Sequence, residues 1–222
     1  MRIFTHHIAV ATLALACAFT PALAQPAPAR APVVANTPAA QHTVLVMGDS
    51  LSAGYGLTAQ QGWVSLTAQK IAKDKPGWRV VNASISGETT AGGAARIEAE
   101  LQRNAPSIVV IELGANDGLR GLPLAQANAN LTKIILAAKK RGAKIVLVGM
   151  RLPPNYGPDY TRGFERMYAD LAKTYTLAFV PFLLEPIALD MNAFQADRMH
   201  PIASAQPKLR DHVWTTLAPL LK

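Results

Sequence analysis

The chain has 222 residues, half of them hydrophobic, and a formal net charge of +8. This length predicts one domain with a substantial core. The basic residues are scattered and no nucleic-acid motif accompanies them, which argues against a nucleic-acid site and leaves a basic surface able to attract anionic phospholipids or thioesters.

The first 24 residues resemble a secretory signal peptide. Arg2 gives a positive start, residues 8–19 are apolar, and Ala22-Leu23-Ala24 provides a cleavage site. A membrane span would need about 20 apolar residues, and Thr20-Pro21 ends the run earlier, so a retained anchor is less favoured. The only cysteine, Cys17, lies in this leader, so we expect a mature chain without disulfides. Leu15-Ala16-Cys17 faintly resembles a lipoprotein acylation box, which leaves a membrane-tethered lipoprotein as the alternative to a secreted, periplasmic protein.

A Pro/Ala-rich segment, residues 25–41, follows the leader and predicts an extended spacer. The folded domain is expected over residues 42–222. Short apolar runs predict strands at residues 43–47, 79–83, 107–113, 143–149 and 177–181. Helix patterns lie between and after them, at residues 62–74, 91–103, 124–141, 158–175 and 204–221. This alternation indicates a parallel sheet covered on both faces.

A serine stands where the first predicted strand ends, in Gly48-Asp49-Ser50-Leu51. Open α/β sheets bind ligands at the carboxyl ends of their strands, so Ser50 is a candidate nucleophile. A serine hydroxyl needs a base and a group that orients the base. His200 is the favoured base, because Asp197 precedes it by three residues and can share one side of a turn with it. A simple capping turn is the alternative for this pair, and Asp117 is the reserve orienting group.

The other histidines are weaker candidates for the base. They belong to the leader, the spacer or a helix surface (His6, His7, His42 and His212).

An oxyanion needs preorganised donors, and three lie on the same predicted edge. They are the backbone N–H groups of Ser50 and Gly87 and the side-chain amide of Asn116. Glycine and asparagine also favour ordinary turns, so each residue taken singly has that alternative explanation.

Four segments together resemble the ordered blocks of the SGNH (GDSL) hydrolases. They are Gly48-Asp49-Ser50-Leu51, Gly87 after Ser84-Ile85-Ser86, Gly114-Ala115-Asn116-Asp117, and Asp197-Arg198-Met199-His200-Pro201. The resemblance runs from about residue 42 to the end and is closest to the secreted thioesterase I, lysophospholipase and arylesterase branch.

The resemblance implies a flavodoxin-like three-layer α/β/α sandwich with a five-stranded parallel sheet. It also implies cleavage of acyl esters and thioesters through an acyl-enzyme, without metal or cofactor. Ser50, His200 and Asp197 would form the triad, and Ser50, Gly87 and Asn116 the oxyanion hole. An acyl groove would involve Leu119, Leu122, Leu152, Pro153 and Tyr156, although ordinary Gly/Pro loops are the alternative for these segments.

Three positions depart from the family pattern without affecting a catalytic role. Glu88 and Pro154 change loops, which leaves the acyl chain length open, and Ile202 replaces the usual Asn, which would remove a polar contact near the base. The expected partner is a small acyl ester or thioester, including lysophospholipid, with at most transient membrane-surface contact. An O-acetylesterase or acyltransferase using the same triad, or a non-catalytic lipid- or glycan-binding protein, remains the alternative. A metal site is not expected, because the mature domain has few histidines and no cysteine.

Overall fold

The computed structural model describes residues 41–222. The expected leader, with Cys17, and all but the last residue of the expected spacer lie outside the described residues. Five parallel strands form one sheet in the order β2-β1-β3-β4-β5. Their bounds are β1 His42–Gly48, β2 Trp78–Asn82, β3 Ile108–Glu112, β4 Lys144–Val148 and β5 Ala178–Val180. The predicted five-stranded parallel sheet is therefore confirmed, and each predicted strand lies within one residue of an observed one at either end.

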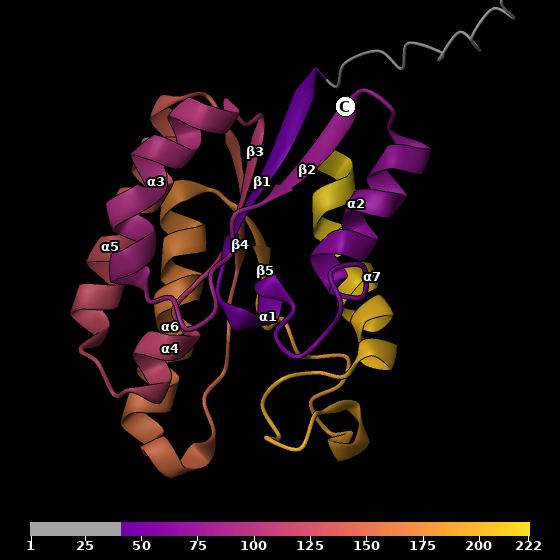
Figure 1. Ribbon diagram of the computed structural model, residues 1–222. Helices are drawn as coiled ribbons and strands as arrows, with labels where there is room; N and C mark the ends of the chain where they lie inside the picture. The colour runs from indigo at the N-terminus through magenta and orange to yellow at the C-terminus, as the bar shows by residue number, and fades with distance from the viewer. Residues whose placement is uncertain (1–40) are drawn as a thin grey trace, which may run out of the picture. The chain divides into compact units, whose positions relative to one another are not determined.

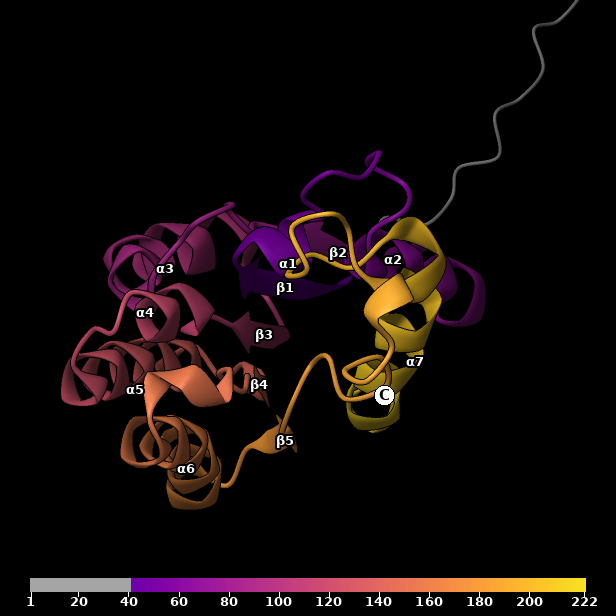
Figure 2. The ribbon, with the colours of Figure 1, turned by 90° about the horizontal axis from the view of Figure 1, so that it is seen from below.

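Helices cover both faces of the sheet (Figure 1). On one face lie α3 Thr90–Asn104, α5 Leu124–Lys140 and α6 Pro158–Tyr175, and on the other α2 Trp63–Asp74 and α7 Gln206–Leu217. The view along the strands separates these two groups (Figure 2). The three-layer α/β/α architecture expected from the family resemblance is thus confirmed.

The core is centred on the two middle strands. Val44 to Met47 of β1 and Ile108 to Ile111 of β3 are at most 2% exposed. Burying one such side chain stabilises the folded state by about 1.5–3 kcal/mol. These two strands therefore form the centre of the hydrophobic core. The edge strands β2 and β5 are only partly buried, because each has a single neighbouring strand.

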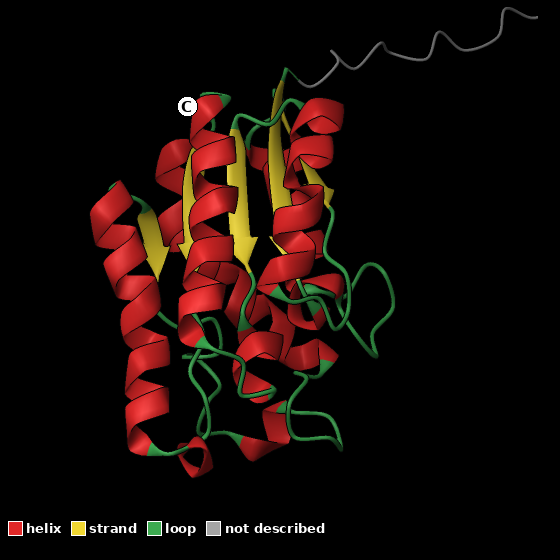
Figure 3. Cartoon of the chain, turned by 90° about the vertical axis from the view of Figure 1, so that its left-hand side faces the viewer, coloured by secondary structure: helices red, strands yellow, loops and turns green. Residues whose placement is uncertain are grey.

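Two short helices follow strands directly, and the sequence patterns did not predict them. They are α1 Ser50–Ala53 after β1 and α4 Ala115–Leu119 after β3. Helices of four and five residues are too short to display a 3.6-residue apolar period. All five strands point toward the same end of the sheet, where these helices and the connecting loops gather (Figure 3). The functional candidates lie at this carboxyl edge.

His42 stands at the expected boundary between spacer and domain, and the structure places it in the domain. It is the first residue of β1, its Nδ1 lies 3.1 Å from the Ser107 Oγ, and its ring packs against Trp78. This position is at the opposite end of β1 from Ser50. Within residues 41–222, no helix is both long and apolar enough to cross a bilayer.

Candidate active site

Ser50 is presented by a tight turn between β1 and α1. Asp49 caps α1, and its Oδ1 accepts a hydrogen bond from the backbone N–H of Leu51 at 3.0 Å. Gly48 is required before this turn, because a Cβ there would lie 2.6 Å from the Ser52 side chain and 2.9 Å from Glu112 Oε2. The turn therefore places Ser50 at the first position of α1, at the carboxyl edge of the sheet.

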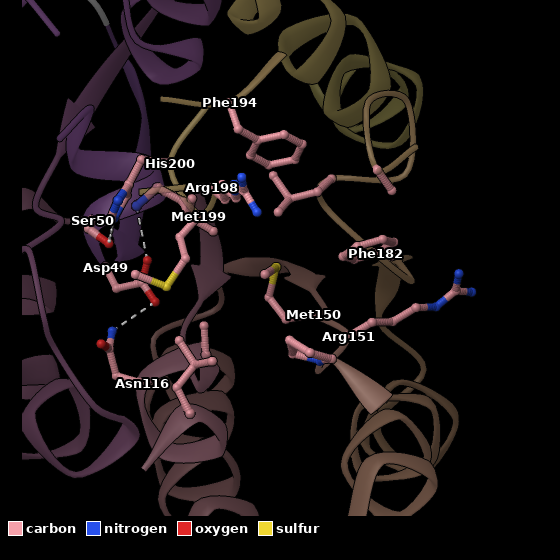
Figure 4. A pocket seen from close by; sticks show the side chains of 16 residues that line it. Asp49, Ser50, Asn116, Met150, Arg151, Phe182, Phe194, Arg198, Met199 and His200 are labelled. Carbon is pink, nitrogen blue, oxygen red and sulfur yellow. Dashed lines mark hydrogen bonds between the residues drawn. The ribbon is translucent and has the colours of Figure 1, made fainter. Parts of the chain in front are cut away.

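Ser50, His200 and Asp197 form a continuous hydrogen-bonded series. Ser50 Oγ lies 2.8 Å from His200 Nε2, and His200 Nδ1 lies 2.7 Å from Asp197 Oδ2. Figure 4 shows the serine and the imidazole facing each other at one end of a pocket. The structure thus brings together three residues that span 150 positions of the chain.

Backbone hydrogen bonds keep Asp197 ionised. Its Oδ1 accepts from the N–H of His200 at 3.0 Å and from the N–H of Met199 at 2.9 Å. These two bonds, followed by the bond to the imidazole, lower the pKa of Asp197 to about 2. An ionised Asp197 accepts a hydrogen bond from Nδ1–H, which leaves Nε2 unprotonated as the acceptor that faces the serine hydroxyl.

The reserve orienting group, Asp117, is engaged elsewhere. Its buried carboxylate accepts from the backbone N–H of Thr90 at 2.8 Å and from the Thr90 hydroxyl at 2.6 Å. Asp117 therefore anchors the start of α3, and the geometry favours Asp197 as the residue that orients His200.

The oxyanion candidates Gly87 and Asn116 occupy the next two loops of the same edge. Gly87 has a φ of 79°, a left-handed backbone conformation that favours glycine. Asn116 lies in the first turn of α4, and its Nδ2 donates to Asp49 Oδ2 at 3.1 Å and to the Glu88 carbonyl at 3.0 Å. Both protons of the Asn116 amide are thus engaged by protein acceptors, so the amide can donate to a substrate oxygen only by exchanging one of these two bonds. Ser50 and Asn116 line the same cavity.

Two buried carboxyl groups, those of Asp49 and Glu112, lie behind Ser50. Burial raises the pKa of Asp49 to about 6, and burial together with the Asp49 charge raises the pKa of Glu112 well above its usual value. Glu112 Oε2 accepts from the Ser52 hydroxyl at 2.6 Å and from the Asp49 N–H at 3.4 Å, while Oε1 has no protein partner. Glu112 was not predicted as a site residue, although an acidic residue in an otherwise apolar strand indicates a buried polar group with a specific role.

A cavity of about 270 Å³ opens beside Ser50 and has mostly apolar walls. Of the expected acyl-groove residues, Leu119 and Pro153 line it. Leu122, Leu152 and Tyr156 are not among its walls. Leu152 is buried beneath Gly118, and the Tyr156 hydroxyl instead donates to the Leu119 carbonyl at 2.9 Å.

The remaining walls come from the far side of the cavity, where the chain leaves β4 and β5. The apolar residues there were not predicted as part of the acyl groove; they are Met150, Phe182, Leu184, Ala188 and Phe194. Only their position could have indicated them, because they follow strands that end at the edge carrying Ser50.

The fold and these contacts define a class of protein. A serine, an imidazole and an ionised carboxylate in series at the carboxyl edge of an open α/β sheet are the arrangement of a serine hydrolase. Comparison with known proteins identifies the family. The model of the GDSL-like Lipase/Acylhydrolase family matches residues 46–206. The chain belongs to this family and is an ester hydrolase.

Two curated relatives align with most of the chain. Esterase TesA of Pseudomonas aeruginosa is 49% identical over 189 residues, which cover 85% of this chain and 94% of the relative. Thioesterase 1/protease 1/lysophospholipase L1 of Escherichia coli K12 is 40% identical over 183 residues, covering 82% of this chain and 86% of the relative. A crystal structure of TesA is 50% identical, covers 81% of this chain and 99% of that chain, and has a TM-score of 0.78.

Proposed function

We propose that the protein hydrolyses acyl esters and thioesters through an acyl-enzyme formed on Ser50. The observation that carries this proposal is the hydrogen-bonded series Ser50–His200–Asp197 at the end of an apolar cavity. The serine supplies a nucleophile, the imidazole a base, and the cavity a place for an acyl chain. The names of the relatives from P. aeruginosa and E. coli include esterase and thioesterase, which agrees with hydrolysis of both oxygen esters and thioesters.

In the first half-reaction, Ser50 Oγ attacks the carbonyl carbon while His200 Nε2 takes the hydroxyl proton. The negative charge on the carbonyl oxygen is stabilised by the N–H groups of Ser50 and Gly87 and by the Asn116 amide, which exchanges its hydrogen bond to the Glu88 carbonyl for one to this oxygen. When the tetrahedral intermediate collapses, the bond to the leaving oxygen or sulfur breaks, and His200 gives its proton to that atom. Water then attacks the acyl-enzyme with His200 again as the base, which releases the fatty acid and restores the serine.

The cavity favours longer acyl groups over acetyl. About 270 Å³ bounded mainly by apolar side chains is far more space than an acetyl group fills. A carbohydrate O-acetylesterase would leave most of this apolar surface unused. Lysophospholipids and acyl thioesters both offer a chain that can occupy the cavity.

The nucleophile is tested by comparing the wild-type protein with Ser50→Ala. We expect kcat on p-nitrophenyl butyrate to fall by at least about 1,000-fold. A fluorophosphonate probe should label the wild type and not the variant. Full activity in Ser50→Ala would show that the nucleophile is elsewhere, and a wild type that neither reacts with the probe nor turns over ester would indicate a binding protein.

The substrate class is tested with a series of acyl chains on p-nitrophenyl and coenzyme A leaving groups. We expect kcat/KM to rise from acetyl to medium chains on both, because each added methylene that enters the cavity contributes up to about 0.8 kcal/mol. A maximum at acetyl would contradict an acyl-binding role for the cavity.

We further propose that the protein is exported to the periplasm and cleaved after Ala24. The arrangement of Arg2, the apolar residues 8–19 and Ala22-Leu23-Ala24 supports this proposal. Mass spectrometry of the exported protein should give a chain that begins at Gln25. A lipid-modified chain that begins at Cys17 would establish the lipoprotein alternative.

A further inference from the structure

Large hydrophobic side chains are exposed almost entirely at one edge of the molecule. Eight such residues are identified within the described part of the chain, and seven lie in the segments that follow the carboxyl ends of the strands. Only Leu136, on helix α5, lies elsewhere. We call the seven residues the apolar rim: Tyr55, Ile85, Leu119, Leu122, Leu189, Met191 and Met199.

Part of the rim lies at the mouth of the cavity that contains Ser50. Leu119 and Met199 are both exposed and part of the cavity wall. The ring of Tyr55 lies 4.6 Å from that of His200, measured between centroids. Figure 2 looks onto this edge, to which the segments that follow the strands belong.

Leu189 is the most unusual member of the rim. It is 100% exposed and follows Ala188, which lines the cavity. Met191, two residues further on, is 56% exposed. Leu189 is therefore not covered by the rest of the protein, and more than half of Met191 is exposed, so this apolar surface is available to a partner.

Two cationic side chains share the edge with the rim. Arg120 and Arg198 form no ion pair with any carboxylate of residues 41–222. Arg120 donates to the Gly87 carbonyl, and Arg198 lines the cavity. Guanidinium groups beside exposed apolar residues match the two parts of a phospholipid surface, the phosphate and the acyl region.

We propose that the apolar rim docks this enzyme onto the surface of phospholipid aggregates. The inference rests on the proposed function in one respect, which is that the cavity accepts an acyl chain. A rim seated in the lipid surface lets the chain pass from lipid to cavity without being exposed to water, which removes the cost of hydrating it. A second copy of the chain would fit the rim less well, because it would cover the mouth through which substrate enters.

The test of docking uses Leu189→Asp combined with Met191→Asp, and Leu136→Asp as the matched control. All three substitutions place a charge at an exposed apolar position, and none touches the proposed triad. Binding is measured by co-sedimentation with phosphatidylcholine vesicles in a Ser50→Ala background, so that it does not depend on turnover. We expect the double variant to bind at least about tenfold more weakly, and the control to bind as the parent does.

Binding should persist in about 1 M salt, where the Debye length is only about 3 Å, because apolar insertion carries it. Attachment that salt abolishes and that the double variant retains would be non-specific electrostatic adsorption and would overturn the proposal. Absence of vesicle binding by the parent would also overturn it. So would gel filtration showing a dimer that the double variant dissociates, because a second copy would then occupy the rim.

Activity gives an independent readout in enzymes that retain Ser50. On soluble p-nitrophenyl butyrate the double variant should match the wild type, whereas on lysophosphatidylcholine micelles its rate should fall by about tenfold, in line with its weaker binding. Equal losses on both substrates would overturn the proposal. If the wild type binds vesicles but hydrolyses no ester, the proposed function fails while docking stands.

Discussion

The side-chain amide of Asn116 donates to Oδ2 of Asp49, the residue immediately before Ser50, at 3.1 Å. The same carboxylate accepts from the backbone N–H of Leu51 through Oδ1. One buried side chain therefore holds both the turn that presents Ser50 and the amide proposed to stabilise the oxyanion.

Replacement of Asp49 by Asn should impair catalysis more than binding. The Asn oxygen can still cap α1, but an NH₂ group would then face the Asn116 amide, so the proposed oxyanion donor loses its orientation. Because removing such a donor entirely costs about 100–1,000-fold in kcat, we expect a loss of about 10–100-fold, with KM changed little. Steady-state kinetics on p-nitrophenyl butyrate, with circular dichroism to confirm folding, provide the measurement. An effect confined to KM would contradict the positioning role.

The raised pKa of Asp49 also makes stability depend on pH. Its folded pKa is about 6 against a usual value of 3.8, so between these values the folded protein holds a proton that the unfolded chain has lost. Folding is therefore favoured at low pH, and this contribution is lost as the pH rises through about 6.

The pH effect can be isolated by comparison with Asp49→Asn, which does not titrate at this position. From pH 7 to pH 4, the unfolding free energy of the wild type should rise relative to the variant by on the order of 2–3 kcal/mol. Urea titrations at several pH values measure this difference. A difference that stays constant, or that shrinks on acidification, would show that Asp49 titrates normally. The low pKa of Asp197 acts in a separate window, between about 2 and 3.8.

Replacing Glu112 with glutamine should leave the stability of the protein nearly unchanged, whereas truncation to alanine should lower it. Burial and the Asp49 charge raise the pKa of the fully buried Glu112 carboxyl group well above the usual value, which favours the neutral carboxyl form, and this form resembles the carboxamide of glutamine. We expect Glu112→Gln to change the unfolding free energy by less than about 1 kcal/mol, and Glu112→Ala to lower it by about 1–3 kcal/mol because Ser52 loses its partner. Urea denaturation distinguishes the two variants. Equal damage from both would mean that Glu112 is ionised.

The sequence predicted the sheet and the major helices well because the signals are local. Apolar runs such as residues 107–113 are buried on both faces and bounded by loops, and the helix predicted at 124–141 ends before Gly142, which has a φ of 75°. The loops that carry Ser50, Gly87, Asn116 and His200 were also placed at one edge, because parallel strands share their carboxyl end.

The walls of the cavity were predicted only in part, since the direction of a loop side chain depends on distant packing. Leu152 turns inward against Gly118, while Phe194, from the long loop before α7, takes its place in the wall. Glu112 was missed for a similar reason. Its environment depends on Asp49 and Ser52, about 60 residues earlier in the chain.

Arg198 occupies a backbone conformation that should cost stability. Its φ is 57°, in the left-handed region, within the turn that joins Asp197 to His200. A residue with a Cβ in this region costs roughly 1–2 kcal/mol, which glycine avoids. Arg198→Gly and Arg198→Ala remove the same guanidinium, so the difference between them isolates the backbone term.

We expect Arg198→Gly to have the higher unfolding free energy, by about 1 kcal/mol, because part of the relief is offset by the greater freedom of glycine in the unfolded chain. Urea denaturation of both variants at pH 7 provides the comparison. An Arg198→Ala variant as stable as Arg198→Gly would show that the turn relaxes to a negative φ without arginine. In that case the side chain itself, through its place in the cavity wall, would hold the left-handed turn beside His200.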